Sequence, residues 1–153
     1  YAQSNSVAFA LNGQLIGLGA GQQNRIDCIR LAGEKAKRWL MMQNASVLEK
    51  YKVYLEANNI TDSFNEYYEY IKNVLPIKET NLLKQVYEEC LREKIVMSSD
   101  GFLPFDDNVE AAQQYNVKAI ANPGRSISDE KVFTKCDEYK MIMFKTNKRF
   151  FFH

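Results

Sequence analysis

Residues 19–25 read GAGQQNR and stand between an apolar, strand-like run and a pattern typical of a helix. Ile26, Ile29, Ala32 and Ala36 follow at helical spacing. The first amide N–H groups of such a helix have no partners inside it and can bind an anionic or carbonyl ligand. The junction therefore predicts a change from strand to helix and a candidate site for a nucleotide or cofactor.

Two interpretations of this junction stay open at the level of the residues. Its glycines match neither GxGxxG nor GxxxxGK[ST], so neither a dinucleotide site nor a P-loop is indicated. In one interpretation, Gly19 and Gly21 only form a tight turn and Arg25 is a solvated residue of the first helical turn. In the other, the glycines let a ligand approach the backbone, and Arg25 contacts it.

Outward from the junction, the sequence alternates between strand and helix patterns. Two apolar runs, residues 6–11 and 14–18, flank Asn12-Gly13, which is a strong hairpin signal and predicts an antiparallel pair. Strand–helix–strand units with short links imply parallel strands in a layered α/β sheet. The expected strands after the middle of the chain are 95–98, 117–122 and 141–145, and the expected helices are 108–115 and 129–139.

The middle of the chain, about 44–94, is rich in Glu, Lys, Tyr and Leu and predicts a helical insertion. We expect helices near 47–56, 62–73 and 79–94, with breaks at Asn58-Asn59 and at Pro76. The Tyr-rich run at 67–70 favours amphipathic packing over a stacking platform for a ligand.

Composition limits the function classes. A chain of 153 residues with 46% hydrophobic content can bury one substantial core, and we expect one lobe over residues 1–153. A net charge of +1 from scattered basic residues gives no footprint for nucleic acid or a membrane surface. Three dispersed cysteines indicate reduced thiols, and no apolar run approaches the ~20 residues of a membrane span, so a cytoplasmic protein is expected. Because it begins at Tyr1, we expect a piece of a longer chain.

Three loops are expected at the carboxyl ends of strands, where open α/β sheets bind ligands. They are residues 19–25, 98–108 and 122–128. Four consecutive apolar residues, Phe102 to Phe105, lie in the second loop, which suggests a pocket or an interface. The simpler alternatives are a capping box of Asp107 with Glu110, and capping of the next helix by Ser126 or Ser128.

Several catalytic schemes are disfavoured. The single histidine is the terminal His153, which leaves little basis for Ser-His-Asp or Cys-His catalysis. The sequence contains neither a CxxC pair nor the HxE…PCxxC signature of nucleobase deaminases, so a zinc site is not expected.

Five blocks, in this order, resemble the C-terminal part of the AICAR transformylase region of the bifunctional purine-biosynthesis family, which also carries IMP cyclohydrolase. The resemblance extends over the whole chain and is loosest across 44–94. The blocks are YAQSNSV at 1–7, NGQLIGLGAGQQNRIDCIRLAGEKA at 12–36, SSDGFLPFDDNVE at 98–110, NPGRS at 122–126 and TNKRFFFH at 146–153.

The resemblance implies formyl transfer from 10-formyltetrahydrofolate to the 5-amino group of AICAR, with no metal required. It implies a three-layer α/β/α lobe similar to cytidine deaminase, with a mixed sheet and without zinc, in a homodimer with shared active sites. The residues it assigns to AICAR are Asn5, Arg25, Phe102 and Arg149, and those it assigns to the folate are Ile26, Asp107, Ser126 and Ile127.

The assigned residue types suit these roles. A carboxylate such as Asp107 can accept both N–H groups of a pterin edge, and a guanidinium such as Arg149 matches a phosphate monoester. The family's Lys-His pair, to which proton transfer is assigned, has no counterpart in this sequence, so we expect no catalytic residue here and no turnover by this segment alone. The alternative function is a dimerisation scaffold, and a monovalent cation near Ser6, Asp100 and His153 is left open.

Overall fold

The computed structural model describes residues 4–90 and 92–149, which fall into two compact units. The first unit lies within Tyr1–Ala36 and Glu93–His153, and the second is Lys37–Arg92. The boundary between the units falls inside one long helix, α1 (Arg25–Met42). One lobe with a helical insertion at about 44–94 stays a prediction.

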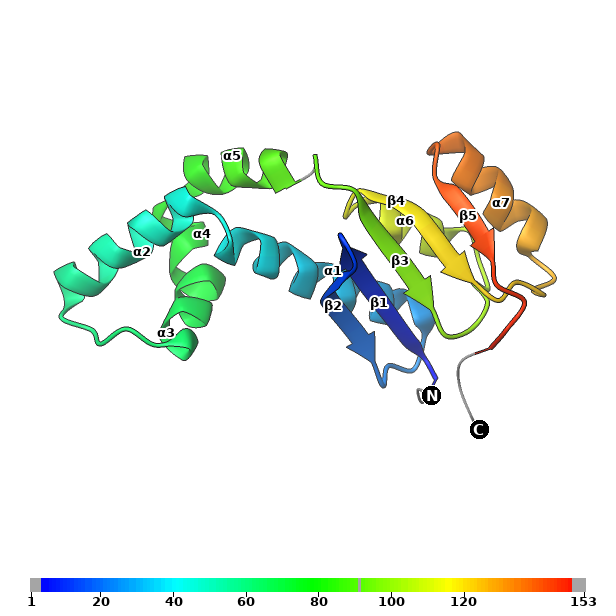
Figure 1. Ribbon diagram of the computed structural model, residues 1–153, viewed down its shortest axis with the longest axis horizontal. Coiled ribbons are helices and arrows are strands. Elements are labelled where there is room, and N and C mark those ends of the chain that lie inside the picture. The colour runs from blue at the N-terminus through cyan, green and yellow to red at the C-terminus, as the bar shows by residue number, and fades with distance from the viewer. Residues whose placement is uncertain (1–3, 91, 150–153) are drawn as a thin grey trace. The chain divides into compact units, whose positions relative to one another are not determined.

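The first unit is built on a mixed, five-stranded sheet in the order β2-β1-β3-β4-β5 (Figure 1). β1 pairs antiparallel with β2 and β3, while β3–β4 and β4–β5 are parallel pairs. The predicted α/β fold class and mixed sheet are therefore confirmed. The strands are β1 (Ser6–Leu11), β2 (Gln14–Ala20), β3 (Ile95–Ser99), β4 (Val117–Asn122) and β5 (Ile142–Lys145).

The predicted hairpin and the strand–helix alternation are also confirmed. Asn12 and Gly13 have φ of 50° and 80°, the left-handed conformations that a two-residue hairpin turn needs. α6 (Asp107–Gln113) and α7 (Asp129–Glu138) connect the parallel strands, close to the ranges expected from the sequence. No helix in the described part of the chain is long and apolar enough to cross a membrane.

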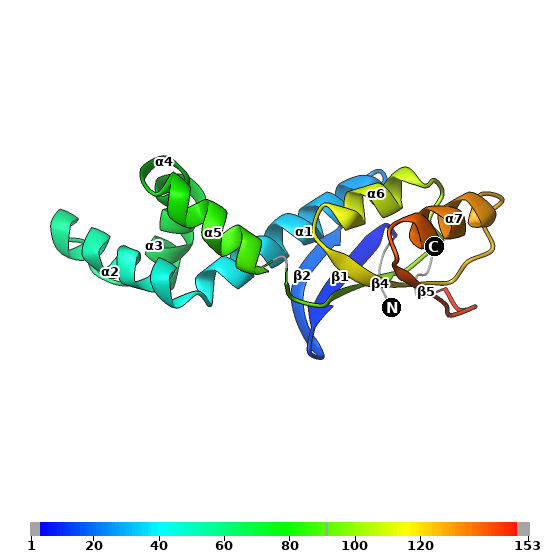
Figure 2. The same ribbon diagram turned by 90° about the horizontal axis from the view of Figure 1, so that it is seen from above.

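The helices of the first unit lie on one face of its sheet. Figure 2 shows α6, α7 and the start of α1 on the same side of the strands. Phe9, Met97 and Ile120 are almost fully buried beneath them. The described residues therefore form two of the three predicted layers, and the resemblance to cytidine deaminase stays a prediction.

Glycines in β2 allow α1 to approach the sheet at backbone distance. A Cβ at Gly19 would lie 1.9 Å from the carbonyl oxygen of Cys28, and a Cβ at Gly17 would lie 2.1 Å from that of Ala32. Gly21 is different, because its φ of +72° favours glycine while the space around it is open. The expectation that these glycines serve ligand approach is thus replaced at Gly19 by helix packing and at Gly21 by backbone conformation.

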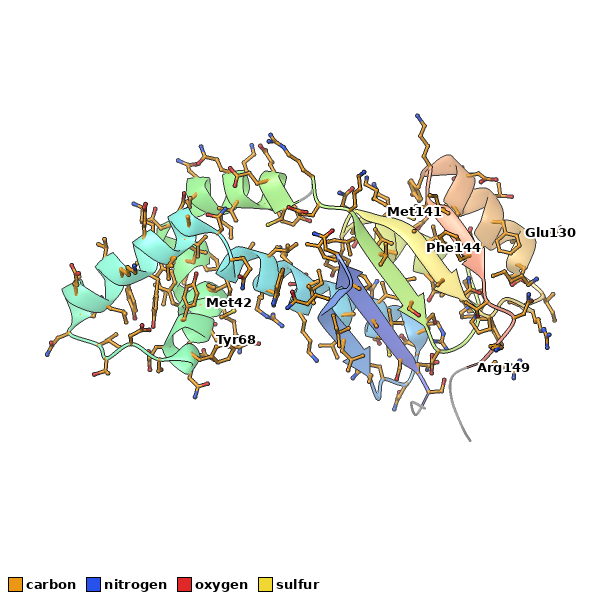
Figure 3. All side chains as sticks on the ribbon, in the orientation of Figure 1. Met42, Tyr68, Glu130, Met141, Phe144 and Arg149 are labelled. Atoms are coloured by element: carbon orange, nitrogen blue, oxygen red, sulfur yellow. The ribbon has the colours of Figure 1, made fainter. Side chains whose placement is uncertain are left out.

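The second unit is helical and has its own core. Val47, Tyr51, Leu55 and Leu75 are buried at its centre. The Tyr51 and Tyr67 rings stack at 4.5 Å, so the Tyr-rich run packs internally as expected; Figure 3 labels the neighbouring Tyr68. The elements are α2 (Ala45–Asn58), α3 (Phe64–Glu69), the π-helical segment η1 (Tyr70–Val74), α4 (Leu75–Lys78) and α5 (Thr80–Cys90).

One predicted helix break is confirmed and one is wrong. Asn59 ends α2 in the left-handed conformation, with φ of 53°. Helical structure continues through Pro76, however, and ends at Glu79. The Leu75 amide donates to the Tyr70 carbonyl in the wider π-helical pattern, and Pro76 then occupies the first turn of α4, where its missing N–H costs little.

Candidate functional site

The three loops singled out from the sequence lie at one edge of the sheet. The strand register places Ser6, at the start of β1, beside Ala20 at the end of β2, and Val7 beside Ser99 at the end of β3. Figure 1 shows the arrowheads of β3, β4 and β5 at this same end. Polar loops from distant parts of the sequence therefore meet where parallel strands end.

A pocket of about 430 Å³ lies at this edge. All four residues predicted to contact AICAR line it: Asn5, Arg25, Phe102 and Arg149. The structure thus brings together side chains from the chain's beginning, middle and end, while their roles stay predictions. The pocket is completed by Ser4, Gln23, Asn24, Gly101 and Pro104.

Sequence reasoning assigned no ligand role to Ser4, Gln23, Asn24 or Gly101. Gln23 and Asn24 are part of the GAGQQNR junction itself, and their polar character was the available signal. Phe102 and Pro104 belong to the apolar run for which a pocket or an interface was expected, and both line the pocket. Phe105, expected beside them, is 62% exposed and is not among the lining residues of this pocket.

Arg25 lines the pocket and is held in place by residues at the end of β3. Its side chain is 7% exposed, which excludes the alternative of a solvated residue in the first turn of α1. Its Nη1 donates to Ser99 Oγ at 2.8 Å and forms a close ion pair with Asp100 Oδ1. Since Ser99 Oγ in turn donates to the Gly101 carbonyl at 2.8 Å, the guanidinium is fixed to the end of β3.

Asp100 has an unused oxygen. Its amide donates to the Ser6 carbonyl at 3.1 Å, and its Oδ1 receives Arg25. Its Oδ2 is buried and accepts no hydrogen bond from the described residues. His153, named beside Ser6 and Asp100 for an open cation question, lies outside those residues.

Asn5 joins the start of β1 to the GAGQQNR loop. Its Nδ2 donates to the carbonyls of Gln22 and Gln23 at 3.3 and 3.4 Å. Its own carbonyl accepts from the Gly21 amide at 3.1 Å and from Cys28 Sγ at 3.2 Å. Burial raises the pKa of the Cys28 thiol, which keeps it a protonated donor in this contact.

Asn24 caps α1 and uses one of the amides at its beginning. Its Oδ1 accepts from the Asp27 N–H at 2.8 Å, and its Nδ2 donates to Asp27 Oδ2 at 2.8 Å. One donor of the anion site expected at this helix start is therefore occupied by Asn24, and the cationic side chains that line the pocket are Arg25 and Arg149.

Arg149 closes the pocket from the opposite end of the sequence. It lies beyond the end of β5, at the edge of the sheet where the pocket is (Figure 3). Its guanidinium carbon stands 5.8 Å from the centre of the Phe102 ring, in cation–π geometry. A fixed guanidinium, a second stacked on an aromatic ring, and the Asn5 amide together suit a flat, polar ring that carries an anionic group.

None of the residues predicted to contact folate is among the residues lining this pocket. Ile26 follows Arg25 in α1 and is half-buried. Asp107 is exposed at the start of α6, and its Oδ1 accepts from Asn108 Nδ2 at 2.7 Å. The capping box suggested for Asp107 is not formed, because Asp106 is the N-cap residue and makes no side-chain cap bond.

Ser126 and Ile127 belong to a loop organised around Asp129. The Asp129 carboxylate accepts from the amides of Arg125 and Ser126 at 2.8 and 3.0 Å and from Lys145 Nζ at 3.3 Å. Burial raises the pKa of Asp129, but these hydrogen bonds outweigh it, and the net pKa is lowered. Ile127 is fully exposed.

The suggested serine caps of α7 are not formed. Ser128 makes no side-chain cap bond, and Ser126 Oγ instead accepts from the Ser128 amide at 3.1 Å. The Ser126 hydroxyl therefore stabilises the loop locally.

Within residues 4–90 and 92–149, no cluster of three or more His, Cys, Asp or Glu side chains is arranged to hold a metal ion. The guanidinium, amide and aromatic groups that line this pocket can bind and orient a ligand.

Comparison with known proteins identifies relatives of this chain. Residues 1–35 match the profile of the AICARFT/IMPCHase bienzyme family. The bifunctional purine biosynthesis protein PurH of Leuconostoc mesenteroides is 28% identical over 153 residues, and that of Prochlorococcus marinus strain NATL1A is 30% identical over 153 residues. Both alignments cover 100% of this chain but 20% of the relative.

The chain is thus related along its whole length to bifunctional PurH proteins, as the sequence blocks predicted. It spans about a fifth of the length of these curated relatives.

Proposed function

We propose that this chain, a relative of one segment of the bifunctional purine-biosynthesis proteins, supplies binding residues for folate-dependent formyl transfer to AICAR. The observation that carries the proposal is the convergence of Asn5, Arg25, Phe102 and Arg149 on one pocket. The first and last of these residues lie 144 positions apart in the sequence, and the resemblance assigns all four to one substrate.

The geometry of each side chain supports its proposed role. Arg149 approaches from solvent and receives the phosphate of AICAR, for which a guanidinium supplies paired donors. The Phe102 ring forms a wall for the flat imidazole. Arg25 is already held by Asp100 and Ser99, so its remaining N–H groups can orient a carboxamide or formyl oxygen without a large loss of side-chain entropy.

Folate is proposed to bind beside this pocket, at Ile26, Asp107, Ser126 and Ile127. Asp107 has an exposed carboxylate that can accept the two parallel N–H groups of the pterin edge. Ile127 offers a fully exposed apolar side chain for the body of the cofactor. The Arg125 and Ser126 amides are occupied by Asp129, so the contribution of Ser126 is assigned to its side chain.

In the proposed reaction, the 5-amino nitrogen of AICAR attacks the formyl carbon of 10-formyltetrahydrofolate. A C–N bond to AICAR forms, and the bond between the formyl carbon and folate N10 breaks with its electron pair passing to N10, which takes up a proton. The proton lost by the amine must be taken up by a base. The Lys-His pair implied for this step has no counterpart in the sequence, so we propose that this segment binds and orients the substrates but does not turn them over.

The proposal also includes a cytidine deaminase-like three-layer lobe, a homodimer with shared active sites and a cytoplasmic location. The second candidate function is a dimerisation scaffold, favoured by exposed apolar side chains such as Phe105 and Phe144.

Calorimetric titration of the purified chain separates the two functions. We expect saturable binding of AICAR with one site per chain, and weaker binding of a folate analogue after Asp107→Asn but not after Asp106→Asn. Asp106 is the matched control because it adjoins Asp107 and its side chain makes no cap bond. A tight dimer in sedimentation that binds neither ligand would support the scaffold, and formyl transfer by the isolated chain would refute the inactive-segment proposal.

A further inference from the structure

Arg125 combines a left-handed backbone with a long, charged side chain. Its φ is 71°, a conformation that costs conformational energy for most residues other than glycine, asparagine and aspartate. Of the described non-glycine residues with a positive φ, four are asparagines, and the other two are Arg125 and Lys140. These two cations need a separate explanation.

The end of α7 explains Lys140. The Lys140 amide donates to the Asp137 carbonyl at 3.0 Å, and the Met141 amide donates to the Cys136 carbonyl at 2.8 Å. This pair of bonds is a common way for a helix to end on a left-handed residue. Arg125 comes before α7 and follows a strand, so helix termination does not account for its conformation.

The loop that contains Arg125 uses its backbone and not its side chain. The Arg125 amide donates to Asp129 Oδ2 at 2.8 Å, but the cation that pairs with this carboxylate is Lys145, at 3.3 Å. Among the residues that the structure describes, the exposed Arg125 guanidinium has no hydrogen-bond or ion-pair partner. Glycine could form the same amide bond with less strain. A strained residue whose side chain the fold does not use is a candidate for ligand binding.

The strand order places Arg125 beside residues proposed to bind folate. β3 and β4 are neighbouring parallel strands, so the loops that follow them leave the same edge of the sheet side by side (Figure 1). The loop after β3 leads to the exposed carboxylate of Asp107, and the loop after β4 contains Arg125 directly before Ser126 and Ile127. An exposed anion and an exposed cation therefore belong to two adjacent loops.

These two charges match the two ends of a folate. The pterin end presents N–H donors, which suit a carboxylate acceptor such as Asp107. The other end is a glutamate with two carboxylates, which suit the paired donors of a guanidinium. In the reverse orientation, the glutamate carboxylates would lie against Asp107 and be repelled. A cation on the neighbouring loop therefore favours one direction of binding.

We infer that Arg125 binds the glutamate carboxylates of the folate and so selects a folate whose tail is charged. The inference rests on the proposed function, since it takes residues of both loops as folate contacts. Two other cations of this region are already engaged, Lys145 by Asp129 and Arg149 by the Phe102 ring. The guanidinium of Arg125 keeps its N–H groups for a ligand.

Calorimetry with the purified chain tests the inference, with 10-formylfolic acid and its dimethyl ester as probes. The ester keeps the pterin and the benzoyl ring but loses both glutamate charges. We expect Arg125→Gly to raise the Kd for the acid roughly three- to tenfold and to change the Kd for the ester by less than about twofold. Lys140→Gly is the matched control, because it removes the same charge at a positive φ at the other end of α7. It should leave both Kd values within about twofold.

Asp107→Asn separates this inference from the proposed function. It acts at the pterin end and should weaken the acid and the ester by the same factor. Failure of the wild-type chain to bind either probe would overturn the folate site and the inference with it. Binding of the acid that Arg125→Gly leaves unchanged, or that Lys140→Gly weakens equally, would overturn the inference alone.

Urea unfolding checks that the Arg125→Gly variant is folded. Its midpoint should stay close to that of the wild type, because relief of the left-handed strain offsets the greater freedom that glycine gives the unfolded chain. Weaker binding of the acid by a variant of unchanged stability then reports on the ligand contact itself.

Discussion

Arg25 shows how far a single residue can be interpreted from sequence. Its position at a strand–helix junction was enough to single it out, but its ion pair was not predictable, because Asp100 lies 75 positions away. The pair forms because β1 places the ends of β2 and β3 at the same edge of the sheet. A local pattern cannot give such a contact; it requires the strand order.

Loss of Arg25 leaves the Asp100 carboxylate buried without its cation. We therefore predict that Arg25→Ala lowers the free energy of unfolding by about 3–5 kcal/mol, the usual effect of breaking a buried ion pair. Arg30→Ala is the matched control, because Arg30 is in the same helix but its pair with Asp27 is exposed, and it should cost about 0–1 kcal/mol. Urea unfolding followed by circular dichroism measures both, and equal losses would contradict the role of burial.

Asp129 makes the stability of its loop dependent on pH. Because its pKa is lowered in the folded chain, the carboxylate stabilises the fold above its ordinary pKa of 3.8, and this contribution is lost as the pH falls through the lower, folded value. We predict that Asp129→Asn costs about 1–3 kcal/mol at neutral pH, since it weakens bonds to two amides.

Unfolding measured across the acid range tests this dependence. The difference between the wild type and Asp129→Asn should shrink as the pH falls below 3.8. Asp137→Asn, an exposed position in the same helix, should have a much smaller effect at neutral pH. A difference that is independent of pH would show that the carboxylate charge is not the cause.

At the scale of elements, most of the fold could be predicted from local patterns. The Asn-Gly hairpin, the strands of the sheet and the long helix after the junction each carry a periodicity or turn signal of their own. Pro76 misled the prediction, because a π-helical turn before it shifts the chain so that proline enters a new first turn. The predicted serine and Asp107 caps did not form, because Ser126 Oγ accepts from the Ser128 amide inside the loop and α6 has Asp106, not Asp107, at its N-cap.

Packing of α1 on β2 gives a sharp test at this scale. A methyl group at Gly19 would overlap the Cys28 carbonyl, so Gly19→Ala must push α1 away from the sheet. We predict a loss of about 1–3 kcal/mol in the free energy of unfolding, as for overpacked cores.

Gly21→Asn is the matched control for this change. The space at Gly21 is open, and asparagine tolerates a positive φ, so we expect a loss below about 1 kcal/mol. Urea unfolding distinguishes the two variants. A larger loss for Gly21→Asn would indicate that backbone conformation, and not helix approach, is the main constraint on this turn.

At the scale of the whole molecule, the sequence predicted the family relationship and the α/β class. The third layer that the resemblance implies stays a prediction, because the described helices of the first unit lie on one face of the sheet (Figure 2). At the pocket, the four residues proposed for the substrate came from the resemblance, whereas Asp100 and Ser99, which hold Arg25 in place, follow from the strand order.

The most direct test of the central claim is a calorimetric comparison of AICAR binding by two charge-matched variants. Arg149 lines the pocket, whereas Lys148, next to it and exposed, is not among the lining residues. Loss of a charged contact to phosphate costs about 1.5–3 kcal/mol, so Arg149→Gln should raise the Kd for AICAR by roughly ten- to a hundredfold. Lys148→Gln should leave the Kd within about twofold, and an equal effect of the two variants, or no AICAR binding by the wild-type chain, would contradict the account.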